Sequence, residues 1–197
     1  FYGGRPSSTN TAANGATWAG VEQLGPLVGR GVLFDVARHL GVDRLEAGYG
    51  VTPTDLDGCA ASAGVAIESG DICLVRTGDM QFYKEGDRRR YAVGQDWKLP
   101  GIHPDCIDWF YDHEVAAVFT DTYTFEVFPP PTGNWDDLLA VHMLHLRDMG
   151  MVQGQNWDLE ALAADCAEDG RYTCLLVAGP EPIVGATSAP TVPVAIK

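Results

Sequence analysis

GRGVLFDV, residues 29–36, is a short apolar run with two glycines at its start, and it sets the class of fold. Short runs of β-branched and aromatic residues are typical of strands buried within a sheet. We therefore predict a strand over residues 31–36. Runs of the same kind predict four more strands: DICLVR (71–76), VAAVFT (115–120), YTCLLVA (172–178) and the tail segment VPVAI (192–196).

Helix signals lie between these strands. Thr52 is a suitable N-cap, Pro53 follows at the first helical position, and Gly64 is a suitable stop, which predicts a helix between them. Further helices are expected over residues 104–113, 136–149 and 158–167. Because strands and helices alternate along the chain, the sequence indicates an α/β protein.

The remaining segments define the domain organisation. Residues 1–20 are rich in Gly, Ser, Thr and Asn and show no periodicity, so we expect an irregular loop segment there. A polar loop is expected from residue 77 to Pro100. With no internal repeat and no clear linker, residues 21–197 are expected to form one domain.

The charge balance argues against several classes of partner. The chain has 13 Lys and Arg against 27 Asp and Glu, for a net charge of -14. Because phosphate groups are bound by Lys and Arg, nucleic acid is an improbable partner. The basic run Arg88–Arg90 has acidic neighbours and predicts a solvated loop. No apolar run approaches the ~18 residues of a membrane span, so we expect a soluble, cytoplasmic protein with no membrane partner.

The five cysteines are odd in number, scattered, and without a CxxC pair: Cys59, Cys73, Cys106, Cys166 and Cys174. This spacing favours reduced thiols in a cytosolic compartment. Cys73 and Cys174 fall inside predicted strands, where a thiol behaves as a small hydrophobic group. A hydrolase with a cysteine nucleophile is a weaker alternative.

Candidate chemistry lies in VHMLHLRDMGMVQGQNWDLEAL, residues 141–162. His142 and His145 are three residues apart and share one helix face, and the helix should stop at Gly150. His142 could be a general base or a metal ligand, or it could be a helix histidine that only bonds a nearby loop. For His145 a purely structural role of this kind is favoured more strongly. The amide of Gln155 does not titrate, yet its carbonyl oxygen can bind a divalent cation.

Two acidic residues follow the predicted strand 115–120. Asp121 and Glu126 could ligate a cation through hard oxygens, or they could cap the turn after the strand. The sequence contains no GxSxG, no phosphate loop and no HExxH, so the common nucleophile, nucleotide and zinc-protease signatures are absent.

Four segments taken together resemble the carboxyl-terminal half of the cyclase family, which includes kynurenine formamidase, isatin hydrolase and trans-dienelactone hydrolase. They are GRGVLFDVARHLGVDRLEAG (29–48), VTPTDLDGCAASAGVAIESGDICLVRTG (51–78), EVAAVFTDTYTFEV (114–127) and residues 155–196 with the closing run PEPIVGATSAPTVPVAI. The resemblance spans about residues 20 to 196.

The resemblance implies a swivelling β/β/α-type fold with a mixed sheet flanked by helices. It also implies a metal-dependent hydrolase, with zinc or manganese, that opens a cyclic amide, lactone or formamide. Water activated by the metal would attack the carbonyl of a small-molecule substrate. The metal motif of the family, HxGTHxDxxxH, lies upstream of this half, and FYGGRP resembles the loop that follows it. We therefore expect an amino-terminal portion, and most ligands of the divalent metal, to lie outside this chain.

Two family positions map onto this sequence. His142 resembles the late catalytic histidine, which would shuttle the proton, and Gln155 resembles the Glu or Gln that reaches the metal. A Gln there fits a single-metal site of the isatin hydrolase kind. Asp121, Glu126 and His145 are possible site-lining residues. The alternative is a non-catalytic, cyclase-like binding or structural protein without the metal motif. Sheet edges left open by a missing portion favour a homo-oligomer.

Overall fold

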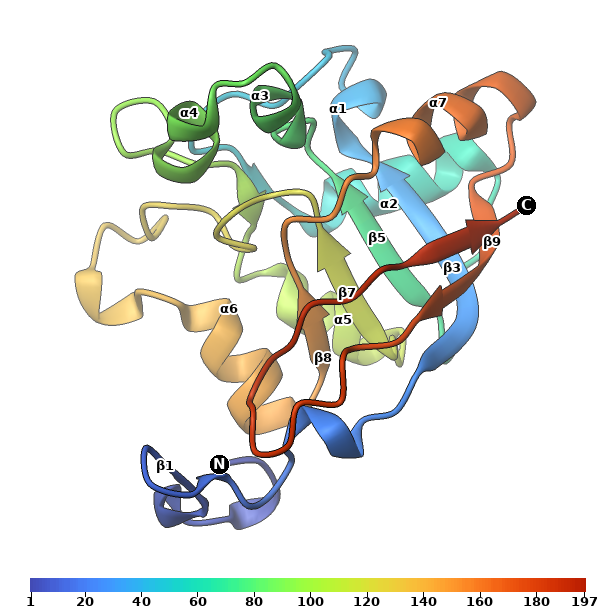
Figure 1. The fold of residues 1–197 in the computed structure, drawn as a ribbon. Coiled ribbons are helices and arrows are strands. Elements are labelled where there is room, and N and C mark those ends of the chain that lie inside the picture. The colour runs from blue at the N-terminus through green and yellow to red at the C-terminus, as the bar shows by residue number, and fades with distance from the viewer.

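The computed structural model describes all residues, Phe1–Lys197, and is built on a six-stranded mixed sheet (Figure 1). The strands lie in the order β10-β9-β3-β5-β7-β8. Neighbours from β3 to β8 run parallel, whereas β9 is antiparallel to both β3 and β10. The predicted α/β class and mixed sheet are confirmed. The strands are β3 Leu27–Asp35, β5 Ile72–Arg76, β7 Ala117–Thr120, β8 Val152–Gly154, β9 Thr173–Ala178 and β10 Val194–Ile196.

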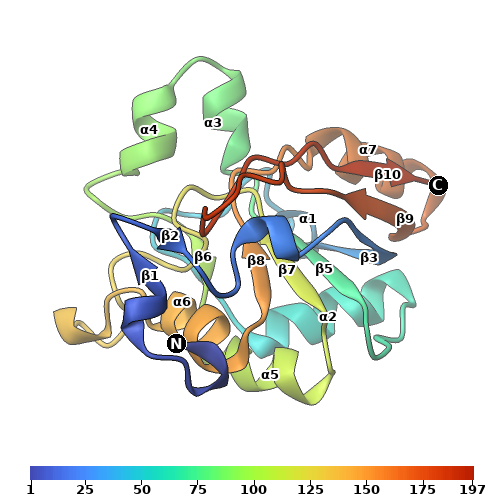
Figure 2. The same ribbon diagram turned by 60° about the horizontal axis from the view of Figure 1, so that its bottom comes forward.

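Both faces of the sheet are covered because side chains alternate along the buried strands. Val32 and Phe34 of β3 belong to a core cluster of 20 residues on the side of α2 (Pro53–Ala63) and α5 (Cys106–Asp112). Leu33 belongs to a second cluster of 12 residues on the side of α7 (Glu160–Asp169). Figure 2 shows α2 and α5 together on one side and α7 on the other.

Helix α2 begins as its sequence predicts. The Thr52 side chain accepts a hydrogen bond from the Asp55 backbone N–H, and the Asp55 carboxylate accepts one from the Thr52 N–H at 2.8 Å. This reciprocal pair satisfies two donors that the first turn leaves without partners. The helix ends before Gly64, whose φ of 65° lies in the left-handed region.

We predict that Thr52→Ala lowers the free energy of unfolding by about 1 kcal/mol, because the cap is lost. Thr54→Ala is the matched control, since Thr54 is exposed in the first turn of the same helix and makes no capping bond. Chemical denaturation monitored by circular dichroism measures both variants. An equal loss in the two variants would contradict the capping role.

The prediction of a polar loop after β5 is wrong, because the chain forms two short helices there. They are α3 Met80–Lys84 and α4 Arg88–Val93. The basic run is therefore helical, with Asp87 as its N-cap accepting the Arg90 N–H at 2.9 Å. Helices this short give too little periodicity to be recognised in a sequence. Both lie beyond the carboxyl ends of β5 and β7 (Figure 1).

Smaller elements complete the chain. The expected irregular segment of residues 1–20 contains a two-stranded hairpin, β1 Asn10–Thr11 with β2 Gly15–Ala16. A four-residue helix, α1 Val36–His39, follows β3, and β4 Gly50–Val51 pairs in parallel with β6 Gly101–Ile102. None of the helices is both long and apolar enough to cross a membrane.

The single helix predicted over residues 136–149 is also wrong, because it is broken at Leu139. Leu139 has a φ of 62°, a left-handed conformation that interrupts a right-handed helix. A 3-10 turn, Trp135–Asp137, precedes the break, and α6 Ala140–His142 continues directly into a π-helix, Met143–Met149. The predicted stop at Gly150 is confirmed, with a φ of 65°.

Candidate active site

The loop after β7 positions Glu126 through backbone hydrogen bonds to β6. The Ile102 N–H donates to the Phe125 carbonyl at 3.0 Å, and the Val127 N–H donates to the Ile102 carbonyl at 3.1 Å. Phe125 is fully buried with a φ of 64°, a strained conformation for a bulky side chain. Gly101 is required opposite, because a Cβ there would collide with the Glu126 backbone.

The Glu126 carboxylate holds the start of α6 and the ring of His142. One oxygen accepts the Val141 N–H at 3.0 Å, and the other accepts the His142 N–H at 3.1 Å. The second oxygen also lies 2.5 Å from Nδ1 of His142. A carboxylate accepts only, so Nδ1 carries the proton, and Nε2 is left as the basic nitrogen. Nε2 of His142 therefore lies on the side of the ring that does not contact Glu126.

His145 is buried, and its environment keeps it neutral. Its Nδ1 lies 3.2 Å from Oε1 of Gln153, and its Nε2 is buried without a hydrogen-bond partner. Burial lowers the pKa of His145 to about 4, because the charged ring would lose its hydration. The rings of His142 and His145 each lie 5.8 Å from the ring of Phe125, so the two histidines share a face. Gln153 was not foreseen, since only the fold brings it to His145.

Gln155 and Asn156 follow the carboxyl end of β8. Gln155 is exposed, and its side-chain amide makes no hydrogen bond within the chain. Asn156 has a φ of 65° and accepts the Tyr91 hydroxyl on Oδ1 at 2.7 Å. Asn tolerates the left-handed region better than most residues. The strand end therefore presents two neighbouring amides to solvent.

Asp121 joins two strand ends. Its carboxylate accepts the Thr77 N–H at 2.9 Å, the Thr77 hydroxyl at 2.8 Å and the Gly78 N–H at 2.8 Å. Nearby, Oδ2 of Asp79 is buried without a partner. Burial, with the Asp121 charge as the next cause, raises the pKa of Asp79 to about 7. Asp79 is thus the member of the pair that takes up a proton near neutral pH.

Asp79→Asn tests this protonation. The folded protein gains a proton at Asp79 as the pH falls through about 7, whereas the unfolded chain does so only near its ordinary value, so burial of Asp79 costs most above pH 7. We expect the variant to be more stable than wild type by roughly 1–3 kcal/mol at pH 8 and by clearly less at pH 5, because the cost disappears fully only near the ordinary pKa of an aspartate. Denaturant titrations at both pH values measure the difference.

Asp112→Asn, at an exposed helix position, is the control for loss of one charge. It should change stability equally at both pH values. A difference between Asp79→Asn and wild type that stays constant from pH 5 to pH 8 would show that Asp79 is ionised throughout.

The cysteines do not offer a nucleophile. All five are buried and unpaired. Burial raises the pKa of every one of these thiols, that of Cys59 to about 12. The thiolate is the reactive form of cysteine, so these side chains belong to the core, and cysteine hydrolysis has no support.

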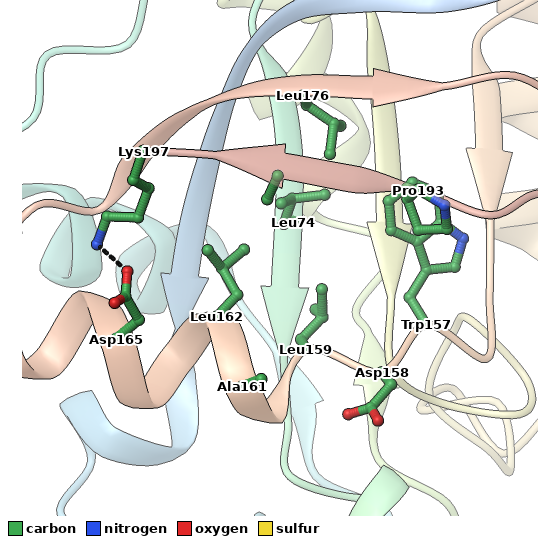
Figure 3. A pocket seen from close by; sticks show the side chains of 11 residues that line it. Leu74, Trp157, Asp158, Leu159, Ala161, Leu162, Asp165, Leu176, Pro193 and Lys197 are labelled. Atoms are coloured by element: carbon green, nitrogen blue, oxygen red, sulfur yellow. Dashed lines mark ion pairs between the residues drawn. The ribbon is translucent and has the colours of Figure 1, made fainter.

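A hollow of about 500 Å³ lies on the α7 side of the sheet (Figure 3), and His142 is not one of its lining residues. Its walls are mostly apolar and include Leu74, Trp157, Leu162 and Pro193. The two charged groups that Figure 3 joins, Lys197 and Asp165, neutralise each other at 2.9 Å. This hollow offers no free titratable group for catalysis.

Two of the predicted residues carry donor atoms of the kind that bind a metal. Nε2 of His142 and the carbonyl oxygen of Gln155 are ligand types for zinc or manganese, and a carboxylate on the other ring nitrogen is the usual support for such a histidine. No group of three His, Cys, Asp or Glu side chains in the chain is placed to hold a metal ion. The two donors alone do not complete a coordination shell.

The sequence profile of the Cyclase family matches residues 8–127, more than half of the chain. The chain belongs to the cyclase family. A crystal structure described as a novel cyclase superposes on it with a TM-score of 0.89 at 35% identity, over 100% of this chain and 64% of that one. No curated protein matches the sequence.

Other cyclase-like structures share the fold at lower identity. Isatin hydrolase A from Labrenzia aggregata has a TM-score of 0.69 at 19% identity, over 90% of this chain and 65% of its own. A "potential metal-dependent hydrolase with cyclase activity" has a TM-score of 0.54 at 17% identity, over 86% and 65%. The chain thus spans less than two thirds of the length of each of these relatives.

Proposed function

We propose that the complete protein is a metal-dependent hydrolase that opens a cyclic amide, a lactone or a formamide, with His142 as the proton shuttle. The observation that carries the proposal is the Glu126 carboxylate on Nδ1 of His142, because it fixes the tautomer and leaves Nε2 basic. The fold shared with isatin hydrolase and with a "potential metal-dependent hydrolase" supports the reaction class.

His142 would act through Nε2. This nitrogen would take a proton from the attacking water and return it to the leaving nitrogen or oxygen. Glu126 would stabilise the charge that the ring gains in between, since it already accepts three hydrogen bonds and is held in place by them. His145 is a poor candidate for this step, because its ring is fully buried and kept neutral.

Gln155 would provide a neutral oxygen ligand from the end of β8, and the other ligands would come from outside this chain. A zinc or manganese ion held there would supply a Lewis acid that lowers the pKa of a bound water and polarises the substrate carbonyl. Because Gln155 is exposed and its amide is free, it can turn toward a ligand without breaking a bond. We further propose a cytoplasmic homo-oligomer.

Two variants of the complete, metal-loaded protein test the proposal. His142→Ala should lower kcat by about 10²–10⁴, the usual contribution of a positioned acid or base. Glu126→Gln should lower kcat by about 10–100-fold with KM nearly unchanged, because it weakens the support of the ring but not the ring itself. Steady-state turnover of a small panel of cyclic amides, lactones and formamides measures both.

His39→Ala is the control, since His39 is exposed near α2 and far along the chain from the loop that carries Glu126. It should leave kcat unchanged. Full turnover by His142→Ala would remove His142 from the mechanism, and no turnover by the wild-type protein on any member of the panel would favour a non-catalytic role.

A further inference from the structure

A groove of about 580 Å³ lies between the α3–α4 pair and the carboxyl ends of β7 and β8. Its walls come from three segments: Met80, Tyr83 and Lys84 of α3, Arg88, Tyr91 and Ala92 of α4, and Tyr123, Asn156 and Asp158 of the strand-end loops. Asn156 directly follows Gln155, so one end of the groove lies one residue from the proposed metal ligand. Ligands commonly bind outside the carboxyl ends of parallel strands.

Three tyrosines form the aromatic wall. The ring of Tyr91 lies 5.6 Å from that of Tyr83 and 6.3 Å from that of Tyr123, in edge-to-face geometry. Tyr91 is 4% exposed, whereas Tyr83 and Tyr123 are 47% and 48% exposed. The exposed parts of the Tyr83 and Tyr123 rings therefore leave apolar surface that a planar ligand can contact. A planar aromatic ring is the group that gains most from such a wall.

The groove also has free hydrogen-bond donors. Lys84 is neutralised by Asp158 at 2.6 Å, but Arg88 makes no ion pair, and its guanidinium lies 5.3 Å from the centre of the Tyr83 ring. Oδ1 of Asn156 is used by Tyr91, so its amide N–H₂ remains free. Both groups can bind an anionic oxygen.

We propose that this groove binds the part of the substrate that does not react, and that this part is a planar aromatic ring bearing a carboxylate or a similar anion. The inference rests on the proposed function for its link to catalysis. Tyr83 and Tyr123 contact the ring, with Tyr91 packed behind them, Arg88 pairs with the anion, and Asn156 donates to it. The groove thereby selects aromatic anions over neutral or aliphatic substrates.

Binding of benzoate to the complete protein tests the groove without turnover. EDTA is present throughout, so that no contact between carboxylate and metal contributes. An NMR titration should show saturable binding that Arg88→Gln weakens by about tenfold, the value of a lost charged hydrogen bond. Arg89→Gln is the matched control, because Arg89 is equally exposed on α4 but does not line the groove. It should bind benzoate as wild type does.

Two further probes separate the aromatic and the ionic contributions. Benzamide keeps the ring without the charge, and cyclohexanecarboxylate keeps the charge without the aromatic ring, so each should bind several-fold more weakly than benzoate. Absent saturation, equal effects of the two arginine variants, or equal affinity for benzamide would each overturn the proposal. If His142→Ala loses hydrolysis but still binds benzoate, the result concerns the proposed mechanism and leaves the groove intact. If the wild-type protein hydrolyses its substrate but does not bind benzoate, the groove proposal alone is overturned.

Discussion

The candidate site depends on the hydrogen bonds of one buried carboxylate, that of Glu126. A carboxylate loses most of its hydration when it is buried, and it is stable there only if hydrogen-bond donors replace the water. Here two backbone N–H groups and the imidazole of His142 supply those donors. The same contacts join the loop after β7 to the start of α6, so removal of the carboxylate would leave both segments without their partner.

This constraint explains the irregular backbone around it. Phe125 adopts a positive φ next to Glu126, and Leu139 adopts one just before α6, so each strained residue borders a segment that the carboxylate holds. Helix α6 and the π-helix that follows it place the rings of His142 and His145, respectively, against Phe125. Strain and π-helical turns are frequent at functional sites, since only a well-fixed surrounding structure retains them.

The sequence predicts the parts of the fold that local chemistry decides. The strand around Phe34 and the helix after Thr52 were expected because burial and capping leave clear patterns. The break at Leu139 and the helices α3 and α4 were missed, because each depends on contacts with distant residues or is too short for a periodic signal. His142 and Glu126 were both named from the sequence, but Glu126 only as a possible cation ligand or turn cap, because its pairing with His142 depends on the fold.

Anomalous X-ray diffraction from crystals of the complete protein, loaded with manganese or zinc, tests the central claim most directly. The account predicts a metal peak about 2.0–2.2 Å from Oε1 of Gln155, with Nε2 of His142 facing the same centre. Nδ1 of His142 should remain on Glu126. A fully occupied metal whose ligands do not include Gln155, or a ring of His142 turned away from it, would contradict the account.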